Sequence, residues 1–243
     1  NHAAYREWSW PPRGRRGGCA PAVLAAADDR FKFAAPVYTC VFGAATVGRM
    51  FGGKDPAQTE KWLSLWNPTH YVGAMRLPVS WFASTNDHAF MFDDLQDTFG
   101  RLPVDPTVVI RPKMIHSHGP WGENMPELFE FADSVLKAGP ALPVVGRPQV
   151  ADGRFSVAVD PKGRTLRRVD LVWTDDAEPD AETDWRVVAC PAPADGRFSA
   201  ALPPGAKRVF ANFVLAGKTG EKTYPEALVS SRAVVTEGRR RSR

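Results

Sequence analysis

The chain has 243 residues, a net charge of +4 and 44% hydrophobic residues, as expected for a globular protein of one large domain or two ordinary ones. No apolar run is long enough for a membrane-spanning helix. Residues 1–18 and 237–243 each carry +3, which leaves −2 for the rest of the chain and argues against a nucleic-acid-binding patch. Cys19, Cys40 and Cys190 have neither metal-site nor disulfide-framework spacing, and we interpret them as buried free thiols.

Residues 1–18 are rich in Arg, Pro, Gly and Trp without any hydrophobic period, which predicts an irregular segment. No signal-peptide pattern opens the chain. Because the chain begins with Asn1 and not with Met, we expect an upstream segment that could carry such a signal. A secreted or periplasmic location is therefore left open.

Residues 19–142 alternate between helical and strand patterns. Helices are predicted over 21–27, 55–65, 91–99 and 123–136, the last with Gly139 as its C-terminal cap. Mostly apolar strands are predicted over 31–39, 78–85 and 107–114. Strands that alternate with helices are typical of a parallel sheet covered on both faces.

The pattern changes at residues 140–143. Short alternating segments then follow, separated by Gly, Pro and Asp turns, over 154–160, 167–174, 184–190, 196–202, 208–215 and 227–235. Such segments predict an antiparallel sandwich of the immunoglobulin or fibronectin kind. We therefore expect an α/β part over 19–142, an all-β sandwich over 143–236 and a basic tail over 237–243.

Two polar side chains follow predicted strands of the α/β part. Asp87 comes directly after the strand at 78–85, and His116 after the strand at 107–114. Strand-Asp, helix, strand-His is the order of the last two members of a Ser-Asp-His triad in the α/β-hydrolase layout. In such a triad the His takes and returns a proton while the Asp fixes its tautomer. His118 is the alternative base, but His116 is favoured because it lies closer to the strand.

Several motifs in this order carry a family resemblance. They are Asp28-Asp29-Arg30-Phe31-Lys32-Phe33, Pro36-Val37-Tyr38, Leu65-Trp66-Asn67-Pro68, Thr85-Asn86-Asp87, the segment 114–119 and the segment 131–136. Over residues 17–236 the chain resembles a bacterial branch of the α/β-hydrolase superfamily, labelled acetylxylan esterase or dienelactone-hydrolase-like and close to prolyl-oligopeptidase-type hydrolases. The resemblance implies an α/β-hydrolase sheet followed by an immunoglobulin-like domain. It also implies Asp87 as triad acid and His116 as base.

The resemblance fails at the nucleophile, which the family carries in a Gly-x-Ser-Trp-Gly-Gly turn. Ser9-Trp10 matches the dipeptide, but Glu7 and Pro11 replace the required glycines. Counting back from the later motifs instead puts Arg15 at the Ser position, and a guanidinium cannot attack a carbonyl. A reading-frame error over the codons for residues 1–16 would explain both observations. We therefore expect a fragment of a serine-type hydrolase that is inactive as given.

The resemblance implies a small ester or an acylated carbohydrate as substrate and no cofactor. The charge distribution and the lack of a long apolar run predict no nucleic-acid or membrane partner. Two alternatives remain: a peptidase of the prolyl-oligopeptidase type, and a non-catalytic module that binds glycans or proteins. Trp173 and Trp185 could stack on sugars in such a module, although core packing is the simpler interpretation. Trp121, just past the triad His, is the best candidate to line a substrate pocket.

Two further clusters have simple interpretations. Asp93 and Asp94 begin the helix at 91–99, and we interpret them as N-terminal caps. The pair His116 and His118, with His70 or His88, could bind a metal ion, but no recognised ligand spacing is complete, and we predict no metal site.

Overall fold

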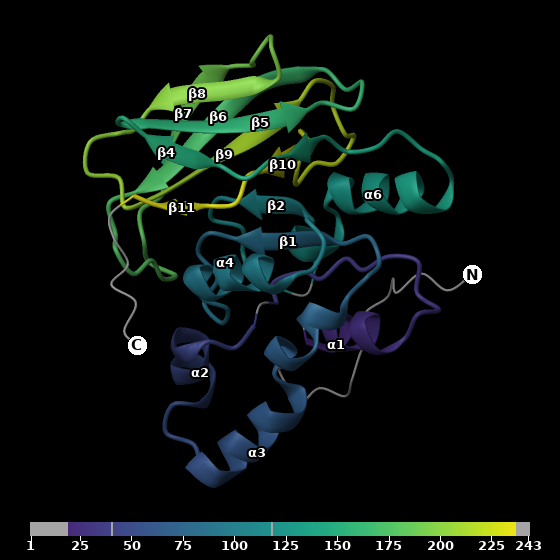
Figure 1. Ribbon diagram of the computed structural model, residues 1–243, viewed down its shortest axis with the longest axis vertical. Coiled ribbons are helices and arrows are strands. Elements are labelled where there is room, and N and C mark those ends of the chain that lie inside the picture. Colours follow the sequence, from purple (N-terminus) through teal and green to yellow (C-terminus); the bar gives the residue numbers. More distant parts are fainter. Residues whose placement is uncertain (1–18, 40, 118, 237–243) are drawn as a thin grey trace.

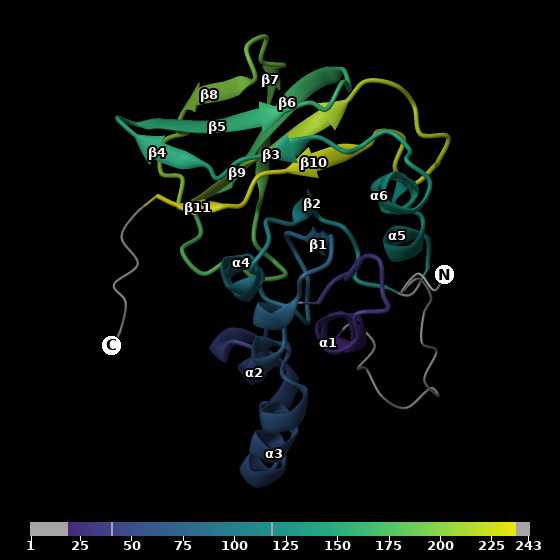
Figure 2. The same cartoon turned by 45° about the vertical axis from the view of Figure 1, so that its right-hand side comes forward.

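The computed structural model describes residues 19–39, 41–117 and 119–236, and it is a mixed α/β protein in which most strands belong to antiparallel sheets. Helices gather in the N-terminal half, below two stacked sheets formed by the C-terminal half (Figures 1 and 2). The first half contains α1 (Cys19–Ala27), α2 (Ala44–Phe51), α3 (Pro56–Trp66), η1 (Pro68–His70), η2 (Val72–Ala74), β1 (Ser80–Ser84), α4 (Phe92–Arg101), β2 (Thr107–Arg111), α5 (Pro120–Glu123) and α6 (Pro126–Leu136). The second half contains β3 (Val144–Val145), β4 (Gln149–Ala151), β5 (Arg154–Asp160), β6 (Leu166–Thr174), β7 (Arg186–Pro191), β8 (Arg197–Ala201), β9 (Arg208–Leu215), β10 (Leu228–Ser230) and β11 (Val234–Val235).

The strands β1 and β2 pair in parallel, with Ser80 opposite Thr107 and Ser84 opposite Arg111. On the other side of β1, the predicted strand at 31–39 forms only isolated parallel bridges, from Ala34 and Val37. Pro36 lies between these bridges and has no N–H to donate, so the ladder is interrupted there. All three segments still run in the same direction, and their carboxyl ends meet at one edge.

The helix predicted over 123–136 begins three residues later, at Pro126, and Glu123 instead ends the short helix α5. Pro126 occupies the first turn of α6, where its missing N–H costs nothing, and α5 precedes it as a separate turn. The left-handed residue after α6 is Ala138 and not Gly139, and the N–H of Gly139 donates to the Asp133 carbonyl. The single strand predicted over 227–235 is likewise divided into β10 and β11.

The C-terminal strands form two antiparallel layers. One has the strand order β3-β5-β4, with β8 on β5; the other has the order β10-β9-β6-β7, with β11 on β9. β10 also pairs with β2 through Ser230 and Val108, so the second layer continues into the parallel strands. One sheet therefore runs through both halves of the molecule.

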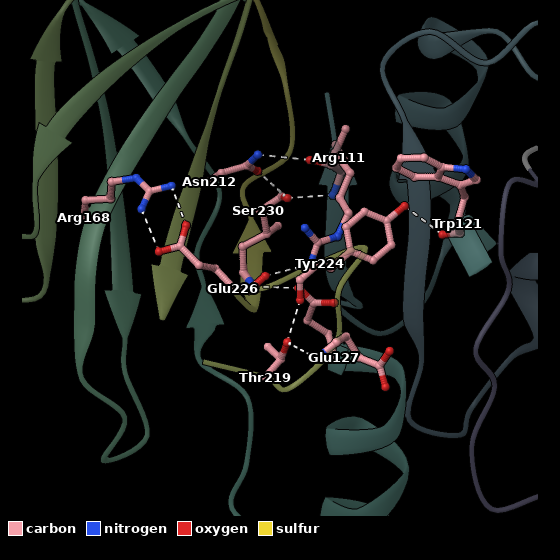
Figure 3. A network of polar contacts seen from close by, with 12 residues as sticks. Arg111, Trp121, Glu127, Arg168, Asn212, Thr219, Tyr224, Glu226 and Ser230 are labelled. Atoms are coloured by element: carbon pink, nitrogen blue, oxygen red, sulfur yellow. Dashed lines mark hydrogen bonds and ion pairs between the residues drawn. The ribbon is translucent and has the colours of Figure 1, made fainter. Parts of the chain in front are cut away.

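A polar network reinforces this seam (Figure 3). The Ser230 hydroxyl accepts from Ile110 N at 2.7 Å and donates to Asn212 Oδ1, while Asn212 Nδ2 donates to the Ile110 carbonyl. Arg111, at the end of β2, pairs with the fully buried Glu127 on α6. Buried hydrogen bonds of this kind favour one arrangement of the elements that they join, although Arg111 Nε and Glu127 Oε2 have no hydrogen-bond partner among the described residues.

Two hydrophobic clusters fill the interior, and both draw side chains from either half. Trp185 and Phe210 of the second half pack with the residues around β1 and β2. Phe33 and Phe131 of the first half pack with buried residues of the C-terminal sheets. No helix within the described ranges is long and apolar enough to span a membrane.

Candidate functional site

Asp87 and His116 meet at the carboxyl edge of β1 and β2. His116 Nδ1 lies 2.9 Å from Asp87 Oδ1 and 2.8 Å from Oδ2, and the Asp87 side chain is only 3% exposed. Asp87 Oδ1 also accepts from the N–H groups of Ala89 and Phe90, at 2.7 and 2.9 Å. These bonds fix the carboxylate in the orientation in which it can hold the imidazole and stabilise its protonated form.

Tyr38 supports the other side of His116. Its ring stacks on the imidazole with centroids 4.3 Å apart and an angle of 13°, and its hydroxyl donates to the Ile115 carbonyl at 2.8 Å. Burial raises the pKa of Tyr38 to about 12, so the hydroxyl remains a neutral donor. Its φ of +66° is strained for a bulky residue, and such strain is typical of sites where geometry is constrained by function.

Tyr38 was not singled out from the sequence as a site residue. Its position gives a usable signal, because it directly follows the bridging segment at 34–37, as Asp87 and His116 follow β1 and β2. Gly122 is required beside it, since a Cβ there would lie 2.7 Å from the Tyr38 ring. The ring of Phe90 is also nearly parallel to that of His116, with centroids 5.8 Å apart.

Polar side chains connect the loops that carry Asp87 and His116. The Thr85 hydroxyl accepts from Lys113 N and donates to Asn86 Oδ1 at 2.6 Å. Asn86 Nδ2 then donates to the carbonyls of Ala181 and Thr183, at 3.0 and 2.8 Å. The loop between β6 and β7 is thereby attached next to the Asp87–His116 pair.

An open cleft of about 450 Å³ lies at this edge. His88, Lys113 and His116 line one side, and Ala181 to Asp184 of the β6–β7 loop line the other. His116 is 20% exposed, so its ring has access to solvent while Asp87 has almost none. This is the arrangement that a general base with a buried orienting carboxylate requires.

The tryptophans proposed from the sequence as ligand contacts lie outside the cleft. The described residues lining the cleft do not include Trp121, which is 38% exposed and lies edge-on to Tyr224. Trp173 and Trp185 are 9% and 3% exposed and belong to the two cores. Trp121 is therefore not part of this cleft, and the burial of Trp173 and Trp185 confirms core packing as the interpretation of that pair.

Three other positions considered from the sequence lie outside the described residues. These are His118, the alternative base, and Ser9 and Arg15, the two positions considered for the nucleophile. The pairing with Asp87 is consistent with the choice of His116.

His88 joins the pair as a third titratable group. Its ring centroid lies 5.0 Å from that of His116. Asp87, His88 and His116 each offer one ligand atom, and these atoms lie within 4.8 Å of one another. His88 follows Asp87 directly in the chain, so only the fold could show that it faces His116.

The site can thus hold a proton on an oriented imidazole beside an open cleft. No protein-family model matches the chain, and no curated protein matches it either.

Proposed function

We propose that the chain is the C-terminal part of a serine-type α/β-hydrolase with an immunoglobulin-like sandwich, and that its reaction is hydrolysis of a carboxylic ester. The observation that carries this proposal is the contact of Asp87 with His116 Nδ1, at the carboxyl ends of two neighbouring parallel strands. This is the acid–base half of a Ser-Asp-His triad in the expected chain order. The family resemblance adds an acetyl or other acyl group on a carbohydrate as the substrate class.

In the proposed reaction, a serine attacks the ester carbonyl and His116 Nε2 takes its proton. Asp87 holds the Nδ1 side of the ring and stabilises the imidazolium. His116 then gives the proton to the leaving alcohol, and water repeats the sequence to release the acid. The chain carries no Gly-x-Ser-x-Gly motif, so we expect the polypeptide as given to be inactive.

The test begins with the DNA through and upstream of the codons for residues 1–20. We expect a frame correction to restore the Gly-x-Ser-Trp-Gly-Gly turn, and the corrected product to hydrolyse p-nitrophenyl acetate. Activity should fall at least about 10³-fold in His116→Ala, because the base is removed. His70→Ala, at an exposed histidine of η1, is the matched control and should keep full activity.

An intact reading frame and an inert protein would contradict the proposal. In that case a non-catalytic binding module becomes the leading interpretation. The Asp87–His116 pair can be checked separately in the chain as given: a far-downfield imidazole proton in the ¹H NMR spectrum should disappear in Asp87→Ala.

A further inference from the structure

We propose that Asp87, His88 and His116 bind one divalent metal ion of the zinc class, and that this binding competes with the Asp87–His116 hydrogen bond. Within the described parts of the chain, these three residues form the one group of three or more His, Cys, Asp and Glu ligands close enough to share an ion. Two imidazoles and one carboxylate are a donor set that zinc accepts, with a further position left for water. The inference does not depend on the proposed hydrolase activity.

The ligands differ in how firmly they are held. Asp87 is 4% exposed, and its Oδ1 is fixed by two backbone N–H groups, which leaves Oδ2 facing His116. Hydrogen bonds of this kind orient a ligand and increase metal affinity. His88 is exposed at the mouth of the cleft, so it can rotate toward an entering ion at little cost.

The charges that face the cleft favour a cation. Glu182 and Asp184 line it from the β6–β7 loop, and Asp87 lies behind His116. The one Lys or Arg among the described lining residues is Lys113, which is 3.4 Å from Asp184. Arg49 also lies near, since its Nε donates to the His88 carbonyl at 3.0 Å. Three carboxylates and two cations leave a net charge of −1 around the three ligands, which attracts an approaching cation.

The spacing explains the competition. Zinc binds His nitrogen and Asp oxygen at about 2.0–2.2 Å, so two tetrahedral ligands lie about 3.3 Å apart. Asp87 Oδ2 and His116 Nδ1 are 2.8 Å apart, so the pair must open by about half an ångström to admit the ion. The ion then takes the place of the Nδ1 proton shared by the two side chains. The neutral His116 ring keeps one proton, which moves through the solvent to Nε2. Metal binding and acid–base chemistry exclude each other at His116.

The test is a titration of the chain as given with Zn²⁺, followed by calorimetry. We expect one ion per chain, and binding weakened at least about 10-fold in His88→Ala, since one of three protein ligands is lost. His88 is exposed, so its substitution should not disturb the fold. His70→Ala is the matched control and should bind as the parent does. Equal affinity in the parent and His88→Ala would overturn the proposal.

A second measurement identifies the ligands. Co²⁺ bound at this site should give the visible spectrum of nitrogen and oxygen ligation, and Zn²⁺ should remove the shared Asp87–His116 proton signal from the ¹H NMR spectrum. A thiolate-to-cobalt band would place the ion on a cysteine and overturn the assignment. So would a shared-proton signal that persists at saturating Zn²⁺. Neither readout requires a nucleophile, so failure here leaves the proposed esterase function standing.

Discussion

Asp87 and Glu127 are both buried carboxylates that pair with a nitrogen-containing side chain, but their partners and surroundings differ. Glu127 is fully buried at the seam between the two halves, and its partner Arg111 stays charged at any ordinary pH (Figure 3). Asp87 faces His116, which can gain or lose a proton and opens onto a cleft. The same type of pairing therefore stabilises the fold at one place and can perform proton transfer at the other.

The largest expected effect is on catalysis at the Asp87 pair. In the frame-corrected product, Asp87→Asn should lower kcat about 10⁴-fold, because the amide cannot hold the catalytic tautomer of His116. The amide oxygen can still accept from Ala89 and Phe90, so the fold should remain. Esterase kinetics and urea denaturation check the two statements. Asp133→Asn, at a half-exposed aspartate of α6, is the control; a loss below about tenfold at Asp87 would remove the distinction between the pairs.

The second effect is on stability at the Glu127 pair. Arg111→Met should lower the free energy of unfolding by about 3–5 kcal/mol, because it leaves a buried carboxylate without its counter-charge. Urea denaturation measures the loss. Replacing both partners with neutral residues, as Arg111→Met with Glu127→Gln, should recover much of it, because the Gln oxygen can still accept from Leu228 N.

The matched control at this seam is Arg167→Met, which removes an ion pair between Glu226 and an arginine side chain that is 62% exposed. Its cost should stay below about 1 kcal/mol. If Arg111→Met were no more costly than this control, the seam would not depend on the buried pair.

The smallest effect concerns the aromatic support of His116. The Tyr38 hydroxyl ionises near pH 10 in the unfolded chain and near about 12 in the folded one, since burial raises its pKa. Its contribution to stability is complete below pH 10 and is lost as the pH rises to 12. Unfolding free energies across this window should fall less in Tyr38→Phe than in the parent, by on the order of 2 kcal/mol. An equal fall of the unfolding free energy in both proteins would show that ionisation of Tyr38 does not cause it.

Local patterns predicted the regular elements well. The residue ranges of β5 and β9 are those expected from apolar alternation. The Asp87–His116 contact was predicted from the order of strand ends in the α/β-hydrolase layout and from the family resemblance. The positions of both residues depend on local information, namely the end of a strand and the residues that follow it.

The features that the sequence did not predict depend on distant contacts. The helix α2 was missed because its cap comes from elsewhere: Asp94 of α4 accepts from Thr46 N at 2.9 Å. Asp93 was predicted to cap its own helix, but it forms a two-pronged ion pair with Arg208 instead. The Asp94–Thr46 contact joins two distant segments of the first half, and the Asp93–Arg208 pair joins the two halves, so neither partner could be assigned from neighbouring residues.

The pairing of β10 with β2 also determines what happens when a protease cleaves the chain between the two halves. A cut in the connection near residue 142 would break the backbone but leave the sheet, the Arg111–Glu127 pair and the Asn86 bonds to the β6–β7 loop in place. The two pieces should migrate together until denaturant is added. The sandwich supplies one wall of the cleft through its β6–β7 loop. Replacing it with another sandwich would remove that wall and the bonds that hold the loop beside Asp87 and His116.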